Sequence, residues 1–524
     1  KVVSPVLADE PKSALYHIDF SFDELRLGGS AYAQAHGKVG SDVPTCTNPE
    51  YFRDTFNAVQ ECVKRGLLLA GHDISAGGLI TTLLEMCFAN TRGGMKINLV
   101  NFETEDIAKI LFAENPGVVV QVANKHEAAF KELLDEAGVG YIYIGTPARE
   151  RSLRIRKGNF EETLDIDALR DVWYAPSHRL DQKQSINGQA DQRFKNYKLQ
   201  PIDIRLPRHF TGNLAQYGIS ADRWHNSTSQ ASSKVQSQVP GGQSAGAPAP
   251  RAAIIREKGT NGEREMAYSL YLAGFDVKDV MMTDLITGRE TLDDIQMIVF
   301  CGGFSNSDVL GSAKGWAGAF LYNPKAKAAL DRFYARKDTL SLGICNGCQL
   351  MVELNLIHNA QCTMHNEAGA QEGKRPEAMM HDELSMMNSI KMLHNDSHKF
   401  ESAFLGLTIP ENNSVMLGSL AGSKLGIWVA HGEGRFHLPQ PESEYHVVAK
   451  YSYDQYPGNP NGSDYAVAGL CSADGRHLAM MPHLERAIFP WQCAYYPASR
   501  RRDEVTPWLE AFVNARKWCE EVVC

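Results

Sequence analysis

The sequence predicts an α/β protein whose two folded parts are joined by a flexible linker. In the C-terminal half, short apolar runs alternate with stretches of helical periodicity, which is typical of a parallel sheet covered by helices on both faces. Residues 226–250 are rich in Ser, Gln, Gly, Ala and Pro and offer almost nothing to bury, so we expect a linker there. The 524 residues are 43% apolar, which is enough for two to four domains with sizeable cores.

The individual elements follow from the apolar runs. Upstream of the linker, the charged stretch 163–196 has helical periodicity and is expected to be helical. After the linker, four apolar runs predict strands and one amphipathic stretch predicts a helix, in the order strand 252–255, helix 262–273, strand 275–280, strand 297–301 and strand 339–344. We therefore expect a first domain over residues 1–160, a helical segment and linker over 161–250, and a last domain over 251–524.

Composition excludes several classes of protein. Eleven cysteines without regular spacing, no signal peptide and no long apolar run indicate a protein of the reducing cytoplasm with no membrane association. The formal net charge of -9 argues against a nucleic-acid partner. The first residue is Lys, and a strand-like run follows almost at once, so we expect a fragment of a longer protein.

The most informative motif is Gly343-Ile344-Cys345-Asn346-Gly347. Apolar strand-like residues precede Cys345 and apolar helix-like residues follow it. A tight strand-to-helix turn needs glycine on both sides, and it presents its central side chain at the N-terminus of a helix. The helix dipole there favours a thiolate, and free backbone N–H groups can hold an oxyanion. The pattern predicts that Cys345 is a nucleophile.

A base for this nucleophile is expected in Pro482-His483-Leu484-Glu485. In an extended segment, side chains two residues apart project from one face, so His483 and Glu485 are predicted to converge on Cys345. The glycine turn after the strand ending near Cys301 is predicted to add oxyanion donors, with Gly303 or Phe304 acting beside Asn346. An ordinary glycine turn is the alternative for that segment.

Cys348 allows two other interpretations of the motif. The spacing Cys345-x-x-Cys348 also occurs in redox dithiols and in halves of zinc sites. A zinc site needs a second close pair, and only Cys519 and Cys524 approach that spacing. We expect Cys348 to turn inward and pack.

With these residues in place, the C-terminal half resembles the class I glutamine amidotransferases. The wider sequence is similar to one family among them, the large single-chain phosphoribosylformylglycinamidine synthases, at 256–265, 302–305, 308–311, 345–349, 430–435 and 456–463. The resemblance implies a flavodoxin-like glutaminase domain with a parallel sheet and a Cys345, His483 and Glu485 triad. This chain departs from the family at Asn306-Ser307, where Tyr-Gly is usual.

The N-terminal part is similar to the last synthetase subdomain of the same family, at 27–34, 66–79 and 83–89. This implies an α+β subdomain of the aminoimidazole ribonucleotide synthetase-like C-terminal type. By resemblance, Asp73 is a Mg²⁺ ligand and Ser75 a nucleotide contact, in an ATP or ADP site that this fragment leaves incomplete. The alternative is that Asp73 only caps the following apolar helix.

The resemblance implies a glutamine amidotransferase of de novo purine biosynthesis, an ATP-dependent C–N ligase. Glutamine is hydrolysed through a cysteine thioester, and the ammonia passes to a synthetase that converts formylglycinamide ribonucleotide to formylglycinamidine ribonucleotide. Two alternatives stay open at this point. One is a flavodoxin-like cysteine peptidase, which would not need the synthetase-like part, and the other is a non-catalytic docking module.

Overall fold

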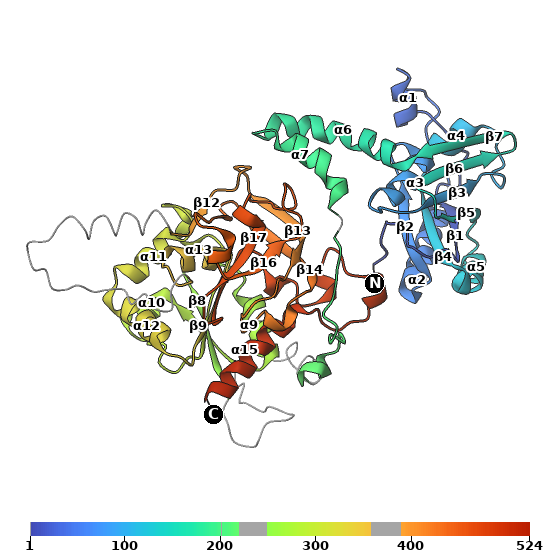
Figure 1. The fold of residues 1–524 in the computed structure, drawn as a ribbon. Coiled ribbons are helices and arrows are strands. Elements are labelled where there is room, and N and C mark those ends of the chain that lie inside the picture. The colour runs from blue at the N-terminus through green and yellow to red at the C-terminus, as the bar shows by residue number, and fades with distance from the viewer. Residues whose placement is uncertain (1, 201, 220–248, 358–388, 524) are drawn as a thin grey trace, which may run out of the picture. The chain divides into compact units, whose positions relative to one another are not determined.

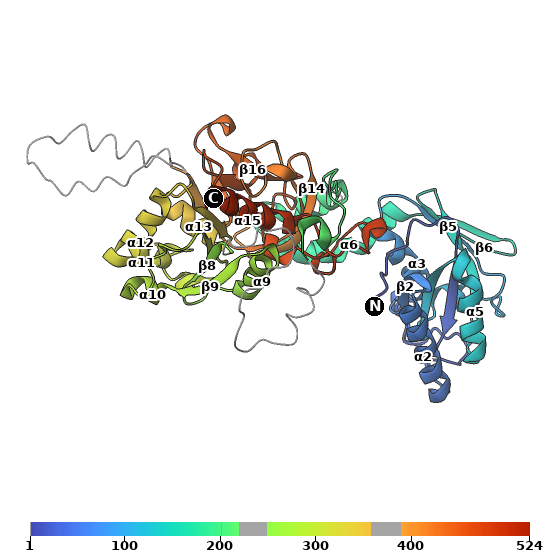
Figure 2. The same ribbon diagram turned by 90° about the horizontal axis from the view of Figure 1, so that it is seen from below.

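The chain folds into two units, Lys1–Gln184 and Ser185–Cys524 (Figures 1 and 2). This computed structural model describes residues 2–200, 202–219, 249–357 and 389–523. Most of the predicted linker, 226–250, lies outside the described residues. The predicted helical stretch 163–196 corresponds to two helices, α6 and α7, although its first residues complete a strand, β7.

The first unit is a mixed sheet of seven strands with helices on both faces. The strand order is β2-β4-β1-β5-β3-β6-β7. Its elements are β1 (Ser13–Asp19), α1 (Ala31–Ala35), α2 (Pro49–Arg65), β2 (Leu68–Ile74), α3 (Gly78–Phe88), β3 (Gly94–Asn98), α4 (Ile107–Phe112), β4 (Gly117–Ala123), α5 (Glu127–Glu136), β5 (Ile142–Ala148), β6 (Ser152–Lys157), β7 (Phe160–Asp165) and α6 (Ile166–Gln184).

Alternation along β1 explains why both faces of this sheet are covered. Ala14, Tyr16 and Ile18 enter one buried cluster with residues of α2 and α5. Leu15 points to the opposite face and joins a second cluster with residues of α3, α4 and α6. Because successive side chains of a strand point to opposite faces, an almost wholly apolar strand needs cover on both sides. The α+β architecture expected for this part is confirmed.

The second unit is built on a nine-stranded sheet in the order β14-β13-β16-β17-β18-β11-β10-β8-β9. Its elements are α7 (Gln189–Asn196), β8 (Arg251–Arg256), α9 (Glu263–Ala273), β9 (Asp276–Met281), α10 (Met282–Thr287), β10 (Met297–Phe300), α11 (Lys314–Leu321), α12 (Pro324–Ala335), β11 (Leu340–Ile344), α13 (Asn346–Glu353), β12 (Lys391–Leu393), β13 (Glu401–Thr408), β14 (Lys424–His431), β15 (Arg435–His437), β16 (Val447–Tyr451), β17 (Val467–Cys471), β18 (His477–Met480) and α15 (Trp508–Val523).

Half of this sheet is parallel, as the sequence predicts. Strands β9, β8, β10, β11 and β18 run parallel to one another. Figures 1 and 2 show α9 and α15 together on one face of them and α10 to α13 on the other. The predicted α/β class is confirmed, and the predicted strands agree with β8, β9, β10 and β11 to within one or two residues. From β18 onward the sheet continues through antiparallel strands β17, β16, β13 and β14.

Candidate active site

The parallel strands bring three distant segments to one edge of the second unit's sheet. β11 pairs with β10 on one side and with β18 on the other. Phe300, Ile344 and Met480 end these strands, and in parallel strands the carboxyl ends share an edge. The residues just beyond the strand ends therefore meet, and they include Cys345 and His483.

Cys345 lies on the sharp turn between β11 and α13. Its φ is 53° and its ψ is -106°, and it is the N-cap of α13. Such a conformation is strained for a residue with a side chain, and it is typical of nucleophile turns. The Cys345 N–H donates to the Met480 carbonyl at 3.0 Å. A Cβ added to Gly347 would lie 2.0 Å from the Phe300 carbonyl oxygen, so only glycine allows the helix to begin this close to β10. The predicted strand, turn and helix are confirmed.

His483 and Glu485 form a buried pair beside the turn. His483 Nδ1 lies 2.7 Å from Glu485 Oε1, and each residue is 2% exposed. The predicted extended geometry for this pair is wrong, because Leu484–Arg486 forms a 3-10 turn. Only His483 is extended, and its N–H donates to the Trp428 carbonyl at 2.9 Å. The turn folds the Glu485 carboxylate back under the imidazole, so the predicted pairing forms although the backbone is not extended there.

Electrostatics favour the imidazolium form of His483. Burial alone would lower its pKa, but the Glu485 carboxylate and the Cys345 side chain outweigh burial and raise the pKa to about 9. Gly302 allows the ring and the nucleophile to approach each other. A Cβ added there would lie 2.9 Å from His483 Cε1 and 3.3 Å from Cys345 Cβ. The arrangement therefore places a protonated imidazole next to the thiol.

The expected oxyanion donors surround the same turn. The Asn346 side chain accepts a hydrogen bond from the Ser305 N–H at 3.2 Å, so the start of α13 is tied to the loop after β10. The Phe304 N–H is engaged by the Gly259 carbonyl at 2.9 Å. Of the three donors named from the sequence, the Phe304 N–H is thus already paired with a backbone carbonyl.

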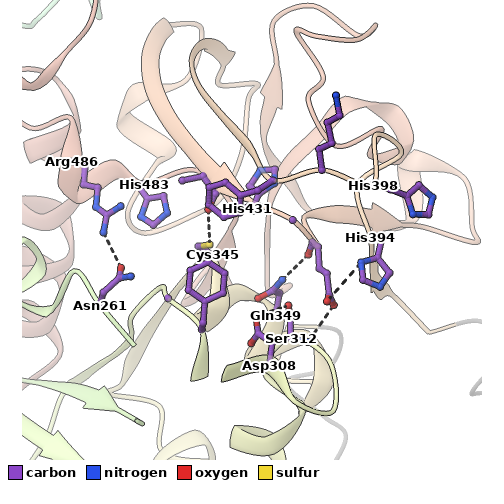
Figure 3. Close-up of a pocket in the computed structure, with 17 residues that line it drawn as sticks. Asn261, Asp308, Ser312, Cys345, Gln349, His394, His398, His431, His483 and Arg486 are labelled. Atoms are coloured by element: carbon purple, nitrogen blue, oxygen red, sulfur yellow. Dashed lines mark hydrogen bonds and ion pairs between the residues drawn. The ribbon is translucent and has the colours of Figure 1, made fainter. Parts of the chain in front are cut away.

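A pocket of about 420 Å³ in the second unit is lined by Cys345 and His483, together with Gly303 and Phe304, and Figure 3 shows Cys345, His431 and His483 at its centre. The Cys345 Sγ lies 3.6 Å from the Ala430 carbonyl oxygen, which closes one side of the pocket. His431 follows at the end of β14 and is 2% exposed. Neither of its ring nitrogens has a hydrogen-bond partner among the described residues.

His431 is neutral in this setting. Burial, together with the neighbouring His483, lowers its pKa to about 3. A buried, unpaired imidazole is costly, since its N–H and its lone pair have both lost water. Both nitrogens are therefore available to a polar molecule in the pocket.

Sequence reasoning singled out no role for four polar residues of this pocket, which are His431, Asp308, Gln349 and Glu433. Gln349 Nε2 donates to the Glu433 carbonyl at 2.6 Å, which joins α13 to the segment after β14. Their signal was present in the stretches 308–311, 345–349 and 430–435, which carried the family resemblance. That signal did not indicate which of these side chains face the nucleophile.

Cys348 packs inward, as predicted. It is fully buried, and burial followed by the neighbouring Cys345 raises its thiol pKa well above the usual value. A thiol held protonated is a poor metal ligand and a poor redox partner. Cys519, the other cysteine considered for zinc, is buried in α15, and Cys524 lies outside the described residues.

In the first unit, Asp73 lies in β2 and Ser75 immediately after it, and both are exposed. The Asp73 side chain is 74% exposed, and its Oδ1 lies 3.4 Å from His72 Nδ1. The helix-cap alternative for Asp73 is wrong, because α3 begins at Gly78, after an N-cap, Gly77, that makes no side-chain cap bond. The Asp73 carboxylate and the Ser75 hydroxyl thus remain open to a ligand.

Two further observations concern only the part of the chain that the structure describes. No group of three or more His, Cys, Asp or Glu side chains is arranged to hold a metal ion there. No helix among those residues combines the length and the apolar character that crossing a membrane requires.

Comparison with known families agrees with this division of the chain. Residues 249–519 match the CobB/CobQ-like glutamine amidotransferase domain. Residues 14–157 match the C-terminal domain of AIR synthase related proteins.

Relatives with similar sequences are long proteins. The chain is 36% identical, over 97% of its own length, to the probable phosphoribosylformylglycinamidine synthase, chloroplastic/mitochondrial, of Arabidopsis thaliana, and covers 34% of that protein. It is 35% identical over 98% of its length to the phosphoribosylformylglycinamidine synthase of Homo sapiens, covering 37% of it. The chain thus spans little more than a third of these curated relatives. Through residues 249–519, which hold the Cys345 turn and its pocket, the chain belongs to the family of CobB/CobQ-like glutamine amidotransferase domains.

Proposed function

We propose that the second unit hydrolyses glutamine and that its ammonia serves a phosphoribosylformylglycinamidine synthase. The observation that carries the proposal is the convergence of Cys345 and His483 in one pocket, with the Glu485 carboxylate paired to the His483 ring. A nucleophile, a base and a group that orients the base are the parts that acyl transfer requires.

The reaction begins with the proton of Cys345 held by His483. The raised pKa of His483, about 9, supports an imidazolium that carries this proton at neutral pH. The thiolate attacks the carboxamide carbon of glutamine, and the carbonyl oxygen takes up the negative charge. The backbone N–H groups near Gly303 and Asn346 hold that charge, because preorganised donors stabilise an oxyanion more than they stabilise a ground-state carbonyl.

Collapse of the tetrahedral intermediate needs an acid at the nitrogen. His483 gives its proton to the departing nitrogen, the carbon–nitrogen bond breaks, and ammonia leaves a γ-glutamyl thioester on Cys345. The neutral His483 then takes a proton from water, which attacks the thioester. Glutamate leaves, and the thiolate and imidazolium pair is restored. Glu485 stabilises the imidazolium and fixes which ring nitrogen faces the sulfur.

The first unit belongs to the synthetase half of the proposed enzyme. There ATP activates the formamide oxygen of formylglycinamide ribonucleotide, and ammonia displaces phosphate to give the amidine. Asp73 would ligate Mg²⁺, and Ser75 would contact the nucleotide. Carboxylate and hydroxyl oxygens suit Mg²⁺, which is usually held by one or two carboxylates and by phosphate oxygens. Both side chains are exposed beside the glycines at the start of α3, and the rest of the site would come from outside this chain.

We assign the domains as residues 1–160, a connecting segment 161–250, and the glutaminase 251–524. A cytoplasmic location without membrane or nucleic-acid partners completes the proposal. The cysteines that the structure describes are free, which supports a reducing compartment.

The test is turnover of glutamine by the chain. We expect equal amounts of glutamate and ammonia, and we expect none from Cys345→Ala. Cleavage of peptides without hydrolysis of glutamine would identify a cysteine peptidase. Binding to the synthetase without turnover of either substrate would identify a docking module.

A further inference from the structure

Two loop segments supply much of the lining of the active-site pocket. The first spans residues 394–400, after β12, and the second spans residues 430–434, at the end of β14 and in the bend before β15. In Figure 3, His394 and His398 belong to the first segment and His431 to the second. Most of these residues lie outside helices and strands, so their buried backbone groups need partners other than a helix or a sheet ladder.

Asn395 supplies such partners for both segments. It is 0% exposed and lies behind the residues that line the pocket. Its Nδ2 donates to the His431 carbonyl at 2.7 Å and to the Lys399 carbonyl at 2.9 Å. Its Oδ1 accepts from the Gly434 N–H at 2.9 Å, and its own N–H donates to the Gly432 carbonyl at 2.9 Å. An amide side chain has two N–H donors and one oxygen, so both polar atoms of the Asn395 side chain are bonded to these two segments.

Gly434 is held from its other side by Asn461. Asn461 is also 0% exposed, and its Nδ2 donates to the Gly434 carbonyl at 2.7 Å. Its Oδ1 accepts from the Ser463 hydroxyl at 2.7 Å, which fixes the orientation of the amide. A Cβ added to Gly434 would lie 2.5 Å from His431 Nδ1, so only glycine lets the chain pass the histidine ring here. Two buried amides therefore fix the peptide groups on both sides of the Gly434 α-carbon.

The second segment also reaches the nucleophile. The Ala430 carbonyl lies 3.6 Å from the Cys345 sulfur. The next carbonyl along the chain, that of His431, is the one that Asn395 holds. The backbone N–H groups of Cys345 and His483 bond instead to β18 and β14. Asn395 therefore orients the segment beside the nucleophile without bonding to the nucleophile or to its base.

We propose that Asn395 is a positioning residue of the glutaminase reaction, and that it shapes the pocket for its substrate through the backbone of residues 430–434. This role rests on the proposed hydrolysis of glutamine. A preorganised pocket loses less free energy on binding than one that must first be ordered. The contribution of Asn395 should therefore appear mainly in the binding of glutamine, and the reactivity of the Cys345 thiol toward a small reagent should not depend on it.

Asn395→Asp is the test variant, because it keeps the shape of the side chain and replaces both N–H donors with an oxygen. Two backbone carbonyls then face an oxygen that cannot donate when it is ionised, so the two segments lose the bonds that join them. We expect KM for glutamine to rise about tenfold, the equivalent of roughly one to two neutral hydrogen bonds, with kcat within about threefold. Steady-state release of glutamate by the full chain measures both constants.

Alkylation by iodoacetamide reports on the nucleophile alone. The Cys345 thiolate displaces iodide and forms a carbon–sulfur bond, and mass spectrometry of the Cys345 peptide measures the rate. Thiol reactivity follows the thiolate fraction and access to the sulfur, so labelling of Asn395→Asp should stay within about threefold of the unmutated chain.

Thr339→Val is the matched control. Thr339 is also 0% exposed, and its hydroxyl donates to two backbone carbonyls, those of Phe333 at 3.0 Å and Arg336 at 3.3 Å. It precedes β11, at the end of the strand opposite the Cys345 turn, so the variant loses a buried donor of the same kind without moving the pocket. Both variants should melt at a lower temperature than the unmutated chain, and only Asn395→Asp should raise KM.

Asn461→Asp acts on Gly434 from the other side and covers the case in which Asn395→Asp does not fold. It removes the bond to the Gly434 carbonyl, so it should also raise KM and leave the labelling rate unchanged.

The outcomes separate this role from the proposed function. An unchanged KM in folded Asn395→Asp, or in Asn461→Asp where Asn395→Asp does not fold, would overturn the positioning role. An equal rise of KM in Thr339→Val would trace the effect to lost stability, and a joint fall of kcat and labelling would assign Asn395 to the nucleophile turn; either result also overturns it. If the unmutated chain is labelled by iodoacetamide but releases no glutamate, the proposed function fails and the role of Asn395 fails with it.

Discussion

His483 Nδ1 lies 2.7 Å from Glu485 Oε1, and both residues are almost completely buried. Glu485 Oε2 has no hydrogen-bond partner among the described residues. The oxygen that faces the imidazole also lies 3.7 Å from Arg486 Nε, so the imidazole is its nearer charged neighbour. This relationship makes the proton-carrying group of the site dependent on a residue that does not itself reach the sulfur.

We expect Glu485→Gln to be less damaging than His483→Ala. The amide still accepts a hydrogen bond and orients the ring, but it stabilises imidazolium less, so kcat should fall about tenfold. Removal of the ring removes the proton carrier and should cost about 10²–10⁴-fold. Steady-state glutamate release measures both variants. Equal defects would assign Glu485 a role beyond orientation.

The same pair predicts a pH dependence of stability. The pKa of His483 is raised in the folded chain to about 9 from the ordinary 6.5. A raised histidine pKa contributes stability that is fully present below the unfolded value and is lost as pH rises through the folded value. Between about pH 6.5 and pH 9, this contribution to the free energy of unfolding should decline. Thermal melts of the chain and of Glu485→Gln across that range should differ, with the smaller decline in the variant.

Substitutions of Cys345 and Cys348 should have clearly different effects on activity. Cys345→Ala is expected to abolish release of glutamate from glutamine, while synthesis from free ammonia in the complete enzyme continues, because the two chemistries occupy different domains. Cys348→Ala removes only a buried packing group, so it should lower stability by about 1 kcal/mol and keep most of the glutaminase activity. A loss in Cys348→Ala as deep as that in Cys345→Ala would contradict the packing role.

Gly302→Ala should impair the site without touching a reacting group. The added methyl would lie 2.9 Å from His483 Cε1, closer than real contacts allow, so the ring must move away from Cys345. We expect kcat to fall about a hundredfold, since small misplacements at a reacting centre cost that much. Gly318→Ala, where the nearest atom lies 3.7 Å away, is the matched control and should remain active. An active Gly302→Ala would show that the His483 ring can accommodate the added methyl group without leaving Cys345.

Asp73→Asn tests the nucleotide site in the first unit. Because Asp73 is exposed and does not cap α3, the variant should melt like the unmutated enzyme when no nucleotide is present. With Mg²⁺ and ADP added to the complete enzyme, the unmutated protein should gain stability by linkage and the variant should gain less. Identical gains in both proteins would exclude Asp73 as a ligand.

The sequence predicts the parallel half of the second unit well, because buried strands such as 252–255 and 297–301 are short, apolar and separated by helical periodicity. It does not predict the antiparallel half. β13, β14, β16 and β17 lie between irregular segments, and their pairing depends on contacts far apart in the chain. Local patterns leave such pairings undetermined.

The site divides in the same way. The Cys345 turn can be predicted from the sequence because its local geometry requires glycine at positions 343 and 347 for steric reasons. The buried His431 ring and the approach of Asp308 to Glu433 cannot be predicted from the sequence. The burial of these side chains and their neighbouring charges arise only when the ends of β10 and β14 come together in the folded unit. The 3-10 turn at Glu485 shows that a correct pair can be found with a wrong local geometry.

The position of β18 has a consequence for the timing of activity. β18 lies directly beside β11 in the sheet, yet it is the last of the strands that the structure describes and is made long after the Cys345 turn. A ribosome-bound chain therefore displays the nucleophile turn before the strand that delivers His483 exists. The proposed hydrolysis of glutamine therefore has to await the synthesis of residues 477–485, because a chain that stops before them has the nucleophile without its base.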